Sequence, residues 1–487
     1  MAKTGYGGMK VLVMGLGLNG GGLESARYMA ARGAELTVTD LRDEKTLAPS
    51  IEKLEASIRP QGIPIRYVLG RHEQADFERA DMVIKNPGVR PDSPYLRAAR
   101  RIETDISLFL AGSPARLTAV TGSKGKSSVS SAVHWVLRRA REKGLLPGKA
   151  WLGGNITLNP LSFLDKLTGD DDVVLELSSW QLGDLKGRGL LKPRCAVLTS
   201  IMRDHLDHYS GMEAYVGDKR LIYQDQDETC STVAGSDGWG RSFLAETKGR
   251  PLMYSPRPLP EGVSGGWLGG GEGSGMVRFY GPCPPGLKAG ESVEAVPEKL
   301  LIPGRHQKLN LLAAALALLD RGLEAAFVRE SLGLFPGIEH RLEFFHEDRG
   351  VRYYNDTAAT IPEAAAAAVE AFYPDSPVLL VTGGTDKNLD FEPLIRAAPR
   401  TKALLLLGGS GTNRIIPLLE KAGLPYQGPF DSAETAAEAA RQTALPGDVV
   451  VLSPGCASFG IFVDEFDRGK KWKAAVLRAC TGKDRGP

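Results

Sequence analysis

The sequence predicts an α/β fold divided into three domains, and three observations lead to this prediction. The chain has 487 residues, which corresponds to roughly three domains at about 150 residues each. Apolar runs of strand length alternate with amphipathic stretches of helical length, a pattern typical of parallel sheets covered by helices on both faces. Two glycine-rich turns directly follow apolar runs. We place the three domains at residues 1–112, 113–336 and 337–487.

The first domain begins with a strand, a helix and a second strand, at residues 10–14, 21–32 and 34–40. The turn after the first strand has the spacing G-x-G-x-x-G, formed by Gly15, Gly17 and Gly20. Asp40 ends the second strand, and this combination is typical of dinucleotide-binding domains. A nicotinamide-dependent dehydrogenase is therefore one interpretation, although it leaves the second glycine-rich turn unexplained. More generally, the turn predicts a helix N-terminus suited to a bound anion.

The second domain opens with an apolar strand at residues 116–122 that runs into the segment "GSKGKSS". Gly122 and Gly125 let successive N–H groups point inward toward a phosphate, and the following helix adds its positive end. Lys126 supplies a charge for the β- and γ-phosphates, and Ser127 supplies a hydroxyl for Mg²⁺. The strict string G-x-x-x-x-G-K-[ST] is not met, so an ordinary glycine-rich turn is the alternative. The strand before it and the amphipathic helix after it favour nucleotide binding.

Acidic and histidine side chains accompany later strands of this domain. Glu176 lies inside the apolar strand at 173–177, where a buried carboxylate is costly unless it is paired or bound to a cation. Beside a phosphate loop such a group is a natural Mg²⁺ ligand, and a structural ion pair is the alternative. The strand at 195–200 is followed by Asp204, His205, Asp207 and His208. Open α/β sheets bind ligands at the carboxyl ends of their strands, but the spacing does not show which of these side chains face the site.

The remaining segments give fewer functional signals. Residues 255–298 are rich in glycine and proline, and they predict a long surface excursion of hairpins and loops rather than a domain. The third domain again alternates, with strands predicted at 377–384, 403–409 and 448–455 and a helix at 363–372.

The composition argues against several classes of function. The net charge of +2 gives no basic surface for nucleic acid or membranes. The five cysteines never form C-x-x-C, which suits a reducing compartment and offers no zinc spacing. The N-terminus has no signal-peptide core, and the longest apolar run, near residue 315, is too short to span a bilayer. We therefore expect a cytoplasmic protein with no membrane insertion and no nucleic-acid partner.

A series of motifs resembles those of the Mur ligases. In chain order they are "GLGLNG", "VTGSKGKSS", "GGNI", "LELSSWQL", "DHLDHY", "DKRLIY", "GRHQKLN", "EHRLEF", "NDTAAT", "GGTDKNLDF" and "SPGCASF". They span the whole chain, and "LELSSWQL" together with "SPGCASF" is most similar to the branch of the family that adds D-glutamate.

The resemblance implies a Rossmann-like N-terminal domain for a UDP-sugar, a central P-loop ATPase-like parallel sheet, and a C-terminal Rossmann-like domain for an amino acid. It implies an ATP-dependent ligase that joins D-glutamate to UDP-N-acetylmuramoyl-L-alanine through an acyl-phosphate intermediate. This reaction belongs to cytoplasmic peptidoglycan precursor synthesis, and so to cell wall biogenesis, cell shape and cell division. We also expect a monomer that uses ATP and two Mg²⁺ ions.

The resemblance also implies roles for individual residues in catalysis and ATP binding. The catalytic residues would be Lys126, Glu176, His205 and Lys219. The metal ligands would be Ser127, Glu176, His205 and Lys219, the last as a carbamylated lysine. ATP would contact Gly122, Ser123, Lys124, Gly125, Lys126, Ser127, Ser128, Asn310, Arg341 and Asp356. Taken by itself, Lys219 would be interpreted as a solvated helix lysine.

Two further sets would bind the substrates. The UDP-sugar would contact Leu18, Asn19, Asp40, Arg42, Asn86, Pro87, Gly88, Asn155, Ser178 and Gln181. The amino acid would contact Thr360, Lys387, Ser458 and Phe462, with Lys387 pairing with a substrate carboxylate.

Four positions depart from the family pattern. Where the family has lysine, asparagine, aspartate and asparagine, this chain has Ala358, Ile361, Gly460 and Lys124. The missing cation at position 358 bears on the identity of the amino acid more than on the reaction, and D-glutamate remains the preferred substrate. A non-catalytic protein of Mur ligase descent that binds nucleotide without turnover is a second alternative, against which the intact catalytic set argues.

Overall fold

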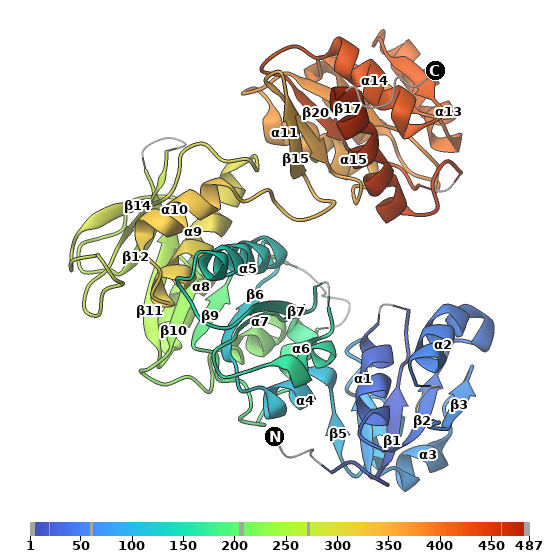
Figure 1. Ribbon diagram of the computed structural model, residues 1–487, viewed down its shortest axis with the longest axis vertical. Helices are drawn as coiled ribbons and strands as arrows, with labels where there is room; N and C mark the ends of the chain where they lie inside the picture. Colours follow the sequence, from blue (N-terminus) through green and yellow to red (C-terminus); the bar gives the residue numbers. More distant parts are fainter. Residues whose placement is uncertain are drawn as a thin grey trace. The chain divides into compact units, whose positions relative to one another are not determined.

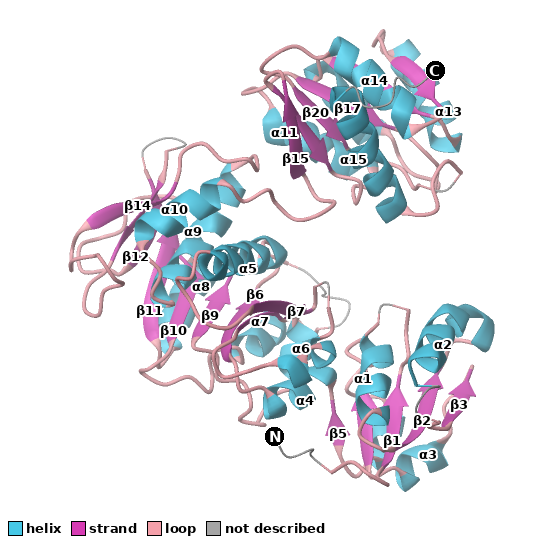
Figure 2. Ribbon diagram, viewed as in Figure 1, coloured by secondary structure: helices cyan, strands magenta, loops and turns pink. Residues whose placement is uncertain are grey.

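The computed structural model describes residues 5–18, 20–58, 62–156, 158–203, 209–269, 273–458 and 460–481. It is a mixed α/β protein with three sheets (Figure 2), which confirms the predicted fold class. The chain forms two compact units. The first contains residues 1–296 and 309–331, and the second contains 297–308 and 332–487. The three domain boundaries inferred from the sequence stay predictions.

The N-terminal sheet has five parallel strands in the order β3-β2-β1-β4-β5 (Figure 1). They are β1 (Lys10–Met14), β2 (Glu35–Asp40), β3 (Ile65–Leu69), β4 (Met82–Lys85) and β5 (Ile102–Glu103). Their helices are α1 (Gly21–Ala30), α2 (Glu44–Ile58), α3 (Gln74–Arg79) and α4 (Asp105–Gly112). The strand order reverses at β1, so the turn after β1 lies at a topological switch point, the usual ligand position in such sheets.

The central sheet has nine strands in the order β14-β13-β12-β11-β10-β9-β6-β8-β7. They are β6 (Arg116–Thr121), β7 (Ala150–Gly154), β8 (Asp172–Glu176), β9 (Cys195–Leu198), β10 (Ser231–Gly235), β11 (Arg250–Ser255), β12 (Gly265–Leu268), β13 (Gly275–Arg278) and β14 (Ser292–Val296). The helices are α5 (Lys126–Glu142), α6 (Ser179–Gly183), α7 (Met212–Arg220), α8 (Gly238–Glu246), α9 (Arg305–Asp320) and α10 (Ala325–Gly333). The strands from β7 to β12 pair in parallel, so the carboxyl ends of β6, β8 and β9 share one edge of the sheet.

The glycine- and proline-rich segment forms hairpins, as predicted, and its strands also extend the central sheet. β12, β13 and β14 continue from β11, and the last two pairings are antiparallel. Two glycines allow this extension to pack against α9. A Cβ atom at Gly266 or Gly275 would lie 2.7 Å or 3.2 Å from Cδ1 of Leu312. The missing side chains therefore make room for a helix against the sheet.

The C-terminal sheet has six strands in the order β15-β16-β20-β17-β18-β19, parallel except for the β15–β16 pair. They are β15 (Glu343–Asp348), β16 (Val351–Asn355), β17 (Val378–Thr382), β18 (Ala403–Leu407), β19 (Gln427–Phe430) and β20 (Val449–Leu452). The helices are α11 (Pro362–Phe372), α12 (Glu392–Ala397), α13 (Ser410–Lys421), α14 (Ala433–Thr443) and α15 (Glu465–Thr481). The predicted strands and the helix at 363–372 are confirmed to within the usual uncertainty at element ends.

The apolar runs of this sheet are buried on both faces because helices cover each side. Leu379 and Val381 of β17 belong to the core with residues of α14 and α15. Val378 and Leu380, which alternate with them, belong to the core with residues of α11, α12 and α13. Alternation across the strand explains why these strands are continuously apolar. Within the described ranges, no helix is both long enough and apolar enough to cross a membrane.

Candidate active site

The phosphate loop joins β6 to α5, and both of its glycines are required by close contacts. Gly122 has φ 145° and Gly125 has φ 91°, in a region that favours glycine. A Cβ at Gly122 would lie 1.9 Å from Oγ1 of Thr199, and one at Gly125 would lie 2.4 Å from Oδ1 of Asn310. The loop is therefore packed tightly between β9 and α9, and Asn310 lies directly beside it.

Lys126 lies at the first position of α5 and turns back over the loop. Its Nζ donates hydrogen bonds to the carbonyl oxygens of Gly122 and Ser123, at 2.9 Å and 3.1 Å. Gly125 precedes α5 and provides no side-chain cap for it. The free N–H groups of a first helical turn and a neighbouring ammonium together make a site for a phosphate. Ser127 and Ser128 lie in this same turn.

Glu176 ends β8 with its carboxylate buried beside α5. The residue is only 2% exposed. Its Oε1 accepts a hydrogen bond from Nδ2 of Asn155 at 3.1 Å, and its Oε2 accepts one from Oγ of Ser130 at 3.5 Å. No lysine, arginine or histidine in the described ranges forms an ion pair with it. The described residues thus give no support to a structural ion pair, and a buried carboxylate with neutral partners suits a bound cation.

Lys219 of α7 is buried beneath the phosphate loop, with 1% of its surface exposed. Its Nζ donates to the carbonyl oxygen of Gly122 at 3.0 Å and lies 4.5 Å from the centre of the Tyr215 ring. The Tyr215 hydroxyl in turn lies 2.9 Å from Oγ of Ser123. Interpreting Lys219 alone as a solvated lysine was wrong, because α7 turns this position toward the loop.

Two predicted site residues, Asn19 and His205, lie outside the described residues, as do Asp204, Asp207 and His208. Among the described residues, no group of three or more His, Cys, Asp and Glu side chains could hold a metal ion. The predicted metal set instead combines a carboxylate, a hydroxyl and a modified lysine with His205.

In the N-terminal sheet, Asp40 and Asn86 bind the glycine turn from two sides. Oδ2 of Asp40 accepts from N of Gly17, and its Oδ1 accepts from N of Arg42, both at 3.0 Å. Nδ2 of Asn86 donates to the carbonyl oxygen of Gly15 at 3.2 Å, and its Oδ1 accepts from N of Gly88 at 3.1 Å. In dinucleotide-binding domains the corresponding acid binds a ribose hydroxyl. Here Asp40 already accepts two backbone N–H groups that shape the turn.

Ser178 and Gln181 form a capping box at the start of α6. Oγ of Ser178 accepts from N of Gln181 at 3.2 Å, and Oε1 of Gln181 accepts from N of Ser178 at 3.0 Å. Each side chain therefore satisfies a free N–H group of the first helical turn. The motif "LELSSWQL" thus combines the buried Glu176 with a helix start immediately after β8.

In the second unit, Asp356 follows β16 and is buried. Its Oδ1 accepts from N of Leu342 at 3.0 Å, and its Oδ2 accepts from Oγ of Ser453 at 2.7 Å. Burial outweighs these hydrogen bonds and raises the pKa of Asp356 to about 6. Arg341 is exposed and Lys387 is exposed in the loop after β17, whereas Ser458 and Phe462 are buried.

Arg468 of α15 connects three loops of this unit, and sequence reasoning missed it. Nε and Nη2 donate to Oγ1 and O of Thr357 at 3.0 Å and 2.9 Å, and Nη1 donates to O of Cys456 at 3.1 Å. A Cβ at Gly384 would lie 3.6 Å from Nη1. These loops carry Thr360, Lys387 and Ser458. Burial lowers the pKa of Arg468 to about 10, so it stays charged at neutral pH. No sequence signal separates it from an ordinary helical arginine.

Comparison with known proteins decides the family. Three family models match: a Mur ligase MurD-like N-terminal domain at 9–107, a Mur ligase middle domain at 120–255 and a Mur ligase glutamate ligase domain at 340–456. The UDP-N-acetylmuramoylalanine–D-glutamate ligase of Treponema pallidum (strain Nichols) is 39% identical, with 96% of this chain and 97% of the relative covered. The chain belongs to the Mur ligase family. The enzyme of the same name from Roseiflexus sp. (strain RS-1) is 38% identical, over 96% of this Mur ligase and 98% of the relative.

Solved structures support the fold of this Mur ligase. A UDP-N-acetylmuramoyl-L-alanyl-D-glutamate–2,6-diaminopimelate ligase has a TM-score of 0.55 at 18% identity, covering 93% of this chain and 90% of that chain. The UDP-N-acetylmuramate–alanine ligase of Thermotoga maritima has a TM-score of 0.51 at 18% identity, covering 98% and 100%. At such identities the likeness concerns the fold alone.

The first unit of this Mur ligase brings several predicted residues together at one edge of the central sheet. They are the phosphate loop with Lys126, Asn155, Glu176, Lys219 and Asn310. Leu18, Asp40, Arg42, Asn86, Pro87 and Gly88 lie around the turn after β1, where Leu18 is 50% exposed. Arg341, Asp356, Thr360, Lys387, Ser458 and Phe462 lie in the second unit.

Proposed function

We propose that this chain joins D-glutamate to UDP-N-acetylmuramoyl-L-alanine in an ATP-dependent reaction. The observation that carries the proposal is similarity to ligases of that name at 38–39% identity over 96% of the chain. The similarity therefore extends over the UDP-sugar, ATP and amino-acid ends alike. The reaction takes place in cytoplasmic peptidoglycan precursor synthesis, which supports cell wall biogenesis, cell shape and cell division, and the chain acts as a monomer.

The reaction has two chemical steps. The alanyl carboxylate attacks the γ-phosphorus of ATP, which forms an acyl phosphate and releases ADP. The amino group of D-glutamate then attacks the acyl carbon, loses a proton, and expels inorganic phosphate. In the first step Lys126 neutralises charge on the transferring phosphoryl group, and the loop N–H groups hold the phosphates in place.

Two Mg²⁺ ions fit the residues around the loop. Glu176, with its buried carboxylate and neutral partners, and Ser127 would hold one, and His205 with a carbamylated Lys219 would hold the other. The ions would supply positive charge that screens the repulsion between two anionic substrates.

Carbamylation of Lys219 is supported by its surroundings. An ammonium excluded from water is costly, and this one has a carbonyl oxygen and an aromatic ring as described neighbours. Addition of the amine nitrogen to CO₂, with loss of a proton, gives an anion that can bind a hard cation. The burial of Lys219 thus suits a modified side chain better than a permanent cation.

The substrates fit the remaining predicted residues. Leu18, Asn19, Asp40, Arg42, Asn86, Pro87 and Gly88 would bind the UDP end, and Asn155, Ser178 and Gln181 the muramoyl-alanine end. Asn310, Arg341 and Asp356 would surround ATP. The exposed Lys387 would pair with a carboxylate of the amino acid, near Thr360, Ser458 and Phe462.

The test is phosphate release from ATP in the presence of UDP-N-acetylmuramoyl-L-alanine and a panel of D- and L-amino acids. Release that depends on D-glutamate is the expected result. Release with another amino acid would refute the specificity and leave the ligase chemistry. ATP binding without any release would favour a non-catalytic relative, for which the alanine at position 358 gives a reason.

A further inference from the structure

A second polar cavity lies in the first unit, at the edge of the central sheet opposite the phosphate loop. It measures about 490 Å³, and its polar lining consists of Arg116, Asp170, Asp171, Lys192, Arg194 and Arg321. Arg116 begins β6, Asp171 directly precedes β8, and Arg194 directly precedes β9. The cavity thus lies at the amino ends of strands whose carboxyl ends form the candidate active site.

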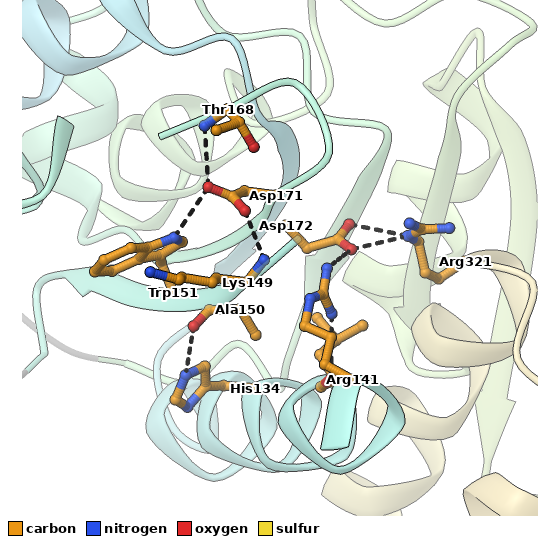
Figure 3. A network of polar contacts seen from close by, with 10 residues as sticks. His134, Arg141, Lys149, Ala150, Trp151, Thr168, Asp171, Asp172 and Arg321 are labelled. Carbon is orange, nitrogen blue, oxygen red and sulfur yellow. Dashed lines mark hydrogen bonds and ion pairs between the residues drawn. The ribbon is translucent and has the colours of Figure 1, made fainter. Parts of the chain in front are cut away.

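The acidic groups nearest this cavity are already engaged, as Figure 3 shows. Asp171 accepts from N of Lys149 at 2.5 Å, from N of Thr168 at 3.0 Å and from Nε1 of Trp151 at 3.3 Å. Neighbouring Asp172 lies between two arginines. It accepts from Nη2 of Arg141 at 2.5 Å and from Nε of Arg321 at 2.9 Å and 3.1 Å. Neither carboxylate is therefore free to neutralise another cation at short range.

Arg116 carries the unbalanced charge. It is half-buried, and its guanidinium forms no hydrogen bond or ion pair with any residue in the described ranges. Burial and the nearby charges of Arg321 and Arg194 lower the pKa of Arg116, and Asp172 and Asp320 oppose them. Asp320 is itself bound to Arg250 at 2.5 Å. Arg194 makes a hydrogen bond only to the neutral Oγ1 of Thr229 among described residues, at 2.9 Å.

Several guanidinium groups of like charge around one cavity favour an anionic ligand. Each guanidinium presents a planar set of donors that matches two oxygens of a phosphate or carboxylate at once. The volume lies within the range of about 300–1,000 Å³ for small-molecule sites. We propose that this cavity binds a small anion with at least two negative charges, and that a phosphorylated compound is its best match.

This site is separate from the nucleotide site and does not depend on the proposed function. β6 runs from Arg116 to Thr121, just before the phosphate loop, and a strand of that length spans about 17 Å. A small anion bound at Arg116 therefore does not compete with a nucleotide bound at Lys126.

The experiment is isothermal titration of the full chain with inorganic pyrophosphate while a non-hydrolysable ATP analogue saturates the phosphate loop. One pyrophosphate site should remain in the wild-type chain. Arg116→Gln and Arg194→Gln should each weaken it by about tenfold or more, because each removes a charged hydrogen-bond donor. Arg194 is exposed, so its variant tests the site even if Arg116→Gln unfolds. Arg138→Gln is the matched control and should bind as the wild type does, since Arg138 is exposed on α5 and pairs with Glu142.

A parallel titration with citrate distinguishes two kinds of anion. Binding of pyrophosphate alone supports a phosphorylated ligand, and binding of citrate with the same loss in the two variants supports the wider class of multivalent anions. The proposal is overturned if the wild-type chain binds neither anion once the ATP analogue is present. It is equally overturned if both variants bind as tightly as Arg138→Gln.

Discussion

Replacing Arg468 by methionine should weaken both the stability of the second unit and its affinity for the amino acid. Methionine keeps much of the side-chain volume but removes all three hydrogen bonds to Thr357 and Cys456. An acceptor left unpaired in the interior costs about 1–3 kcal/mol. Removing a buried guanidinium also removes its desolvation cost, which offsets part of that loss. We therefore expect a net loss of about 3 kcal/mol in the free energy of unfolding.

The functional effect should be specific to one substrate. Thr357 and Cys456 lie in the loops that carry Thr360 and Ser458, so loosening these loops should raise KM for D-glutamate. KM for the UDP-linked substrate should change little, because its predicted contacts lie in the first unit.

The assays are urea unfolding and steady-state phosphate release at varied D-glutamate. The matched control is Arg478→Met on the same helix, which removes an exposed pair with Glu434. Such a pair contributes about 0–1 kcal/mol. If Arg468→Met matches Arg478→Met in both unfolding free energy and KM for D-glutamate, the positioning role of Arg468 is refuted.

Three further predictions concern the first unit. Gly122→Ala should abolish ATP binding in a titration, because its Cβ would lie 1.9 Å from Oγ1 of Thr199, whereas Gly217→Ala in α7, with nothing within 4 Å, should keep binding; equal affinities would contradict the loop geometry. Lys219→Ala should lose phosphate release and regain part of it with added short carboxylic acids, and an unchanged rate in this variant would rule out the carbamate. Burial raises the pKa of Asp105 from 3.8 to about 6, so the folded state holds a proton that the unfolded state releases between pH 4 and 6. Stability due to Asp105 is therefore present at low pH and lost as pH rises through that window, by about 3 kcal/mol. Urea unfolding of wild type and Asp105→Asn from pH 4 to 7 should show their difference shrinking by that amount, and a constant difference would disprove the shift.

The sequence predicted the layers of the fold well because they depend on local patterns. Continuous apolar strands such as β17 could be identified because helices cover both faces of the sheet, and the amphipathic pattern of α5 identified the helix after the phosphate loop. The same reasoning placed Glu176 in the interior, since its neighbours along the strand are apolar. The extension of the central sheet by β12, β13 and β14 could not be foreseen, because pairing partners distant in sequence leave no periodic signal.

Site residues whose burial depends on tertiary packing could not be found from pattern alone. Lys219 and Arg468 each occupy helical positions where a cation is usually solvated, and only the packing of α7 and α15 places them in the interior. The resemblance to Mur ligases supplied the first, and neither pattern nor resemblance supplied the second. Asp40 shows the opposite error. Its spacing favoured a nicotinamide cofactor, although its carboxylate binds the backbone of the turn.

That use of Asp40 has a consequence for how the N-terminal sheet meets its ligand. Together with Asn86, it fixes the backbone of the turn while the turn is empty, so little conformational entropy remains to be lost when a diphosphate arrives. The recognition surface is preorganised. Substituting Asp40 would then slow and weaken binding chiefly by releasing the turn into many conformations, even though the side chain itself never needs to touch the ligand.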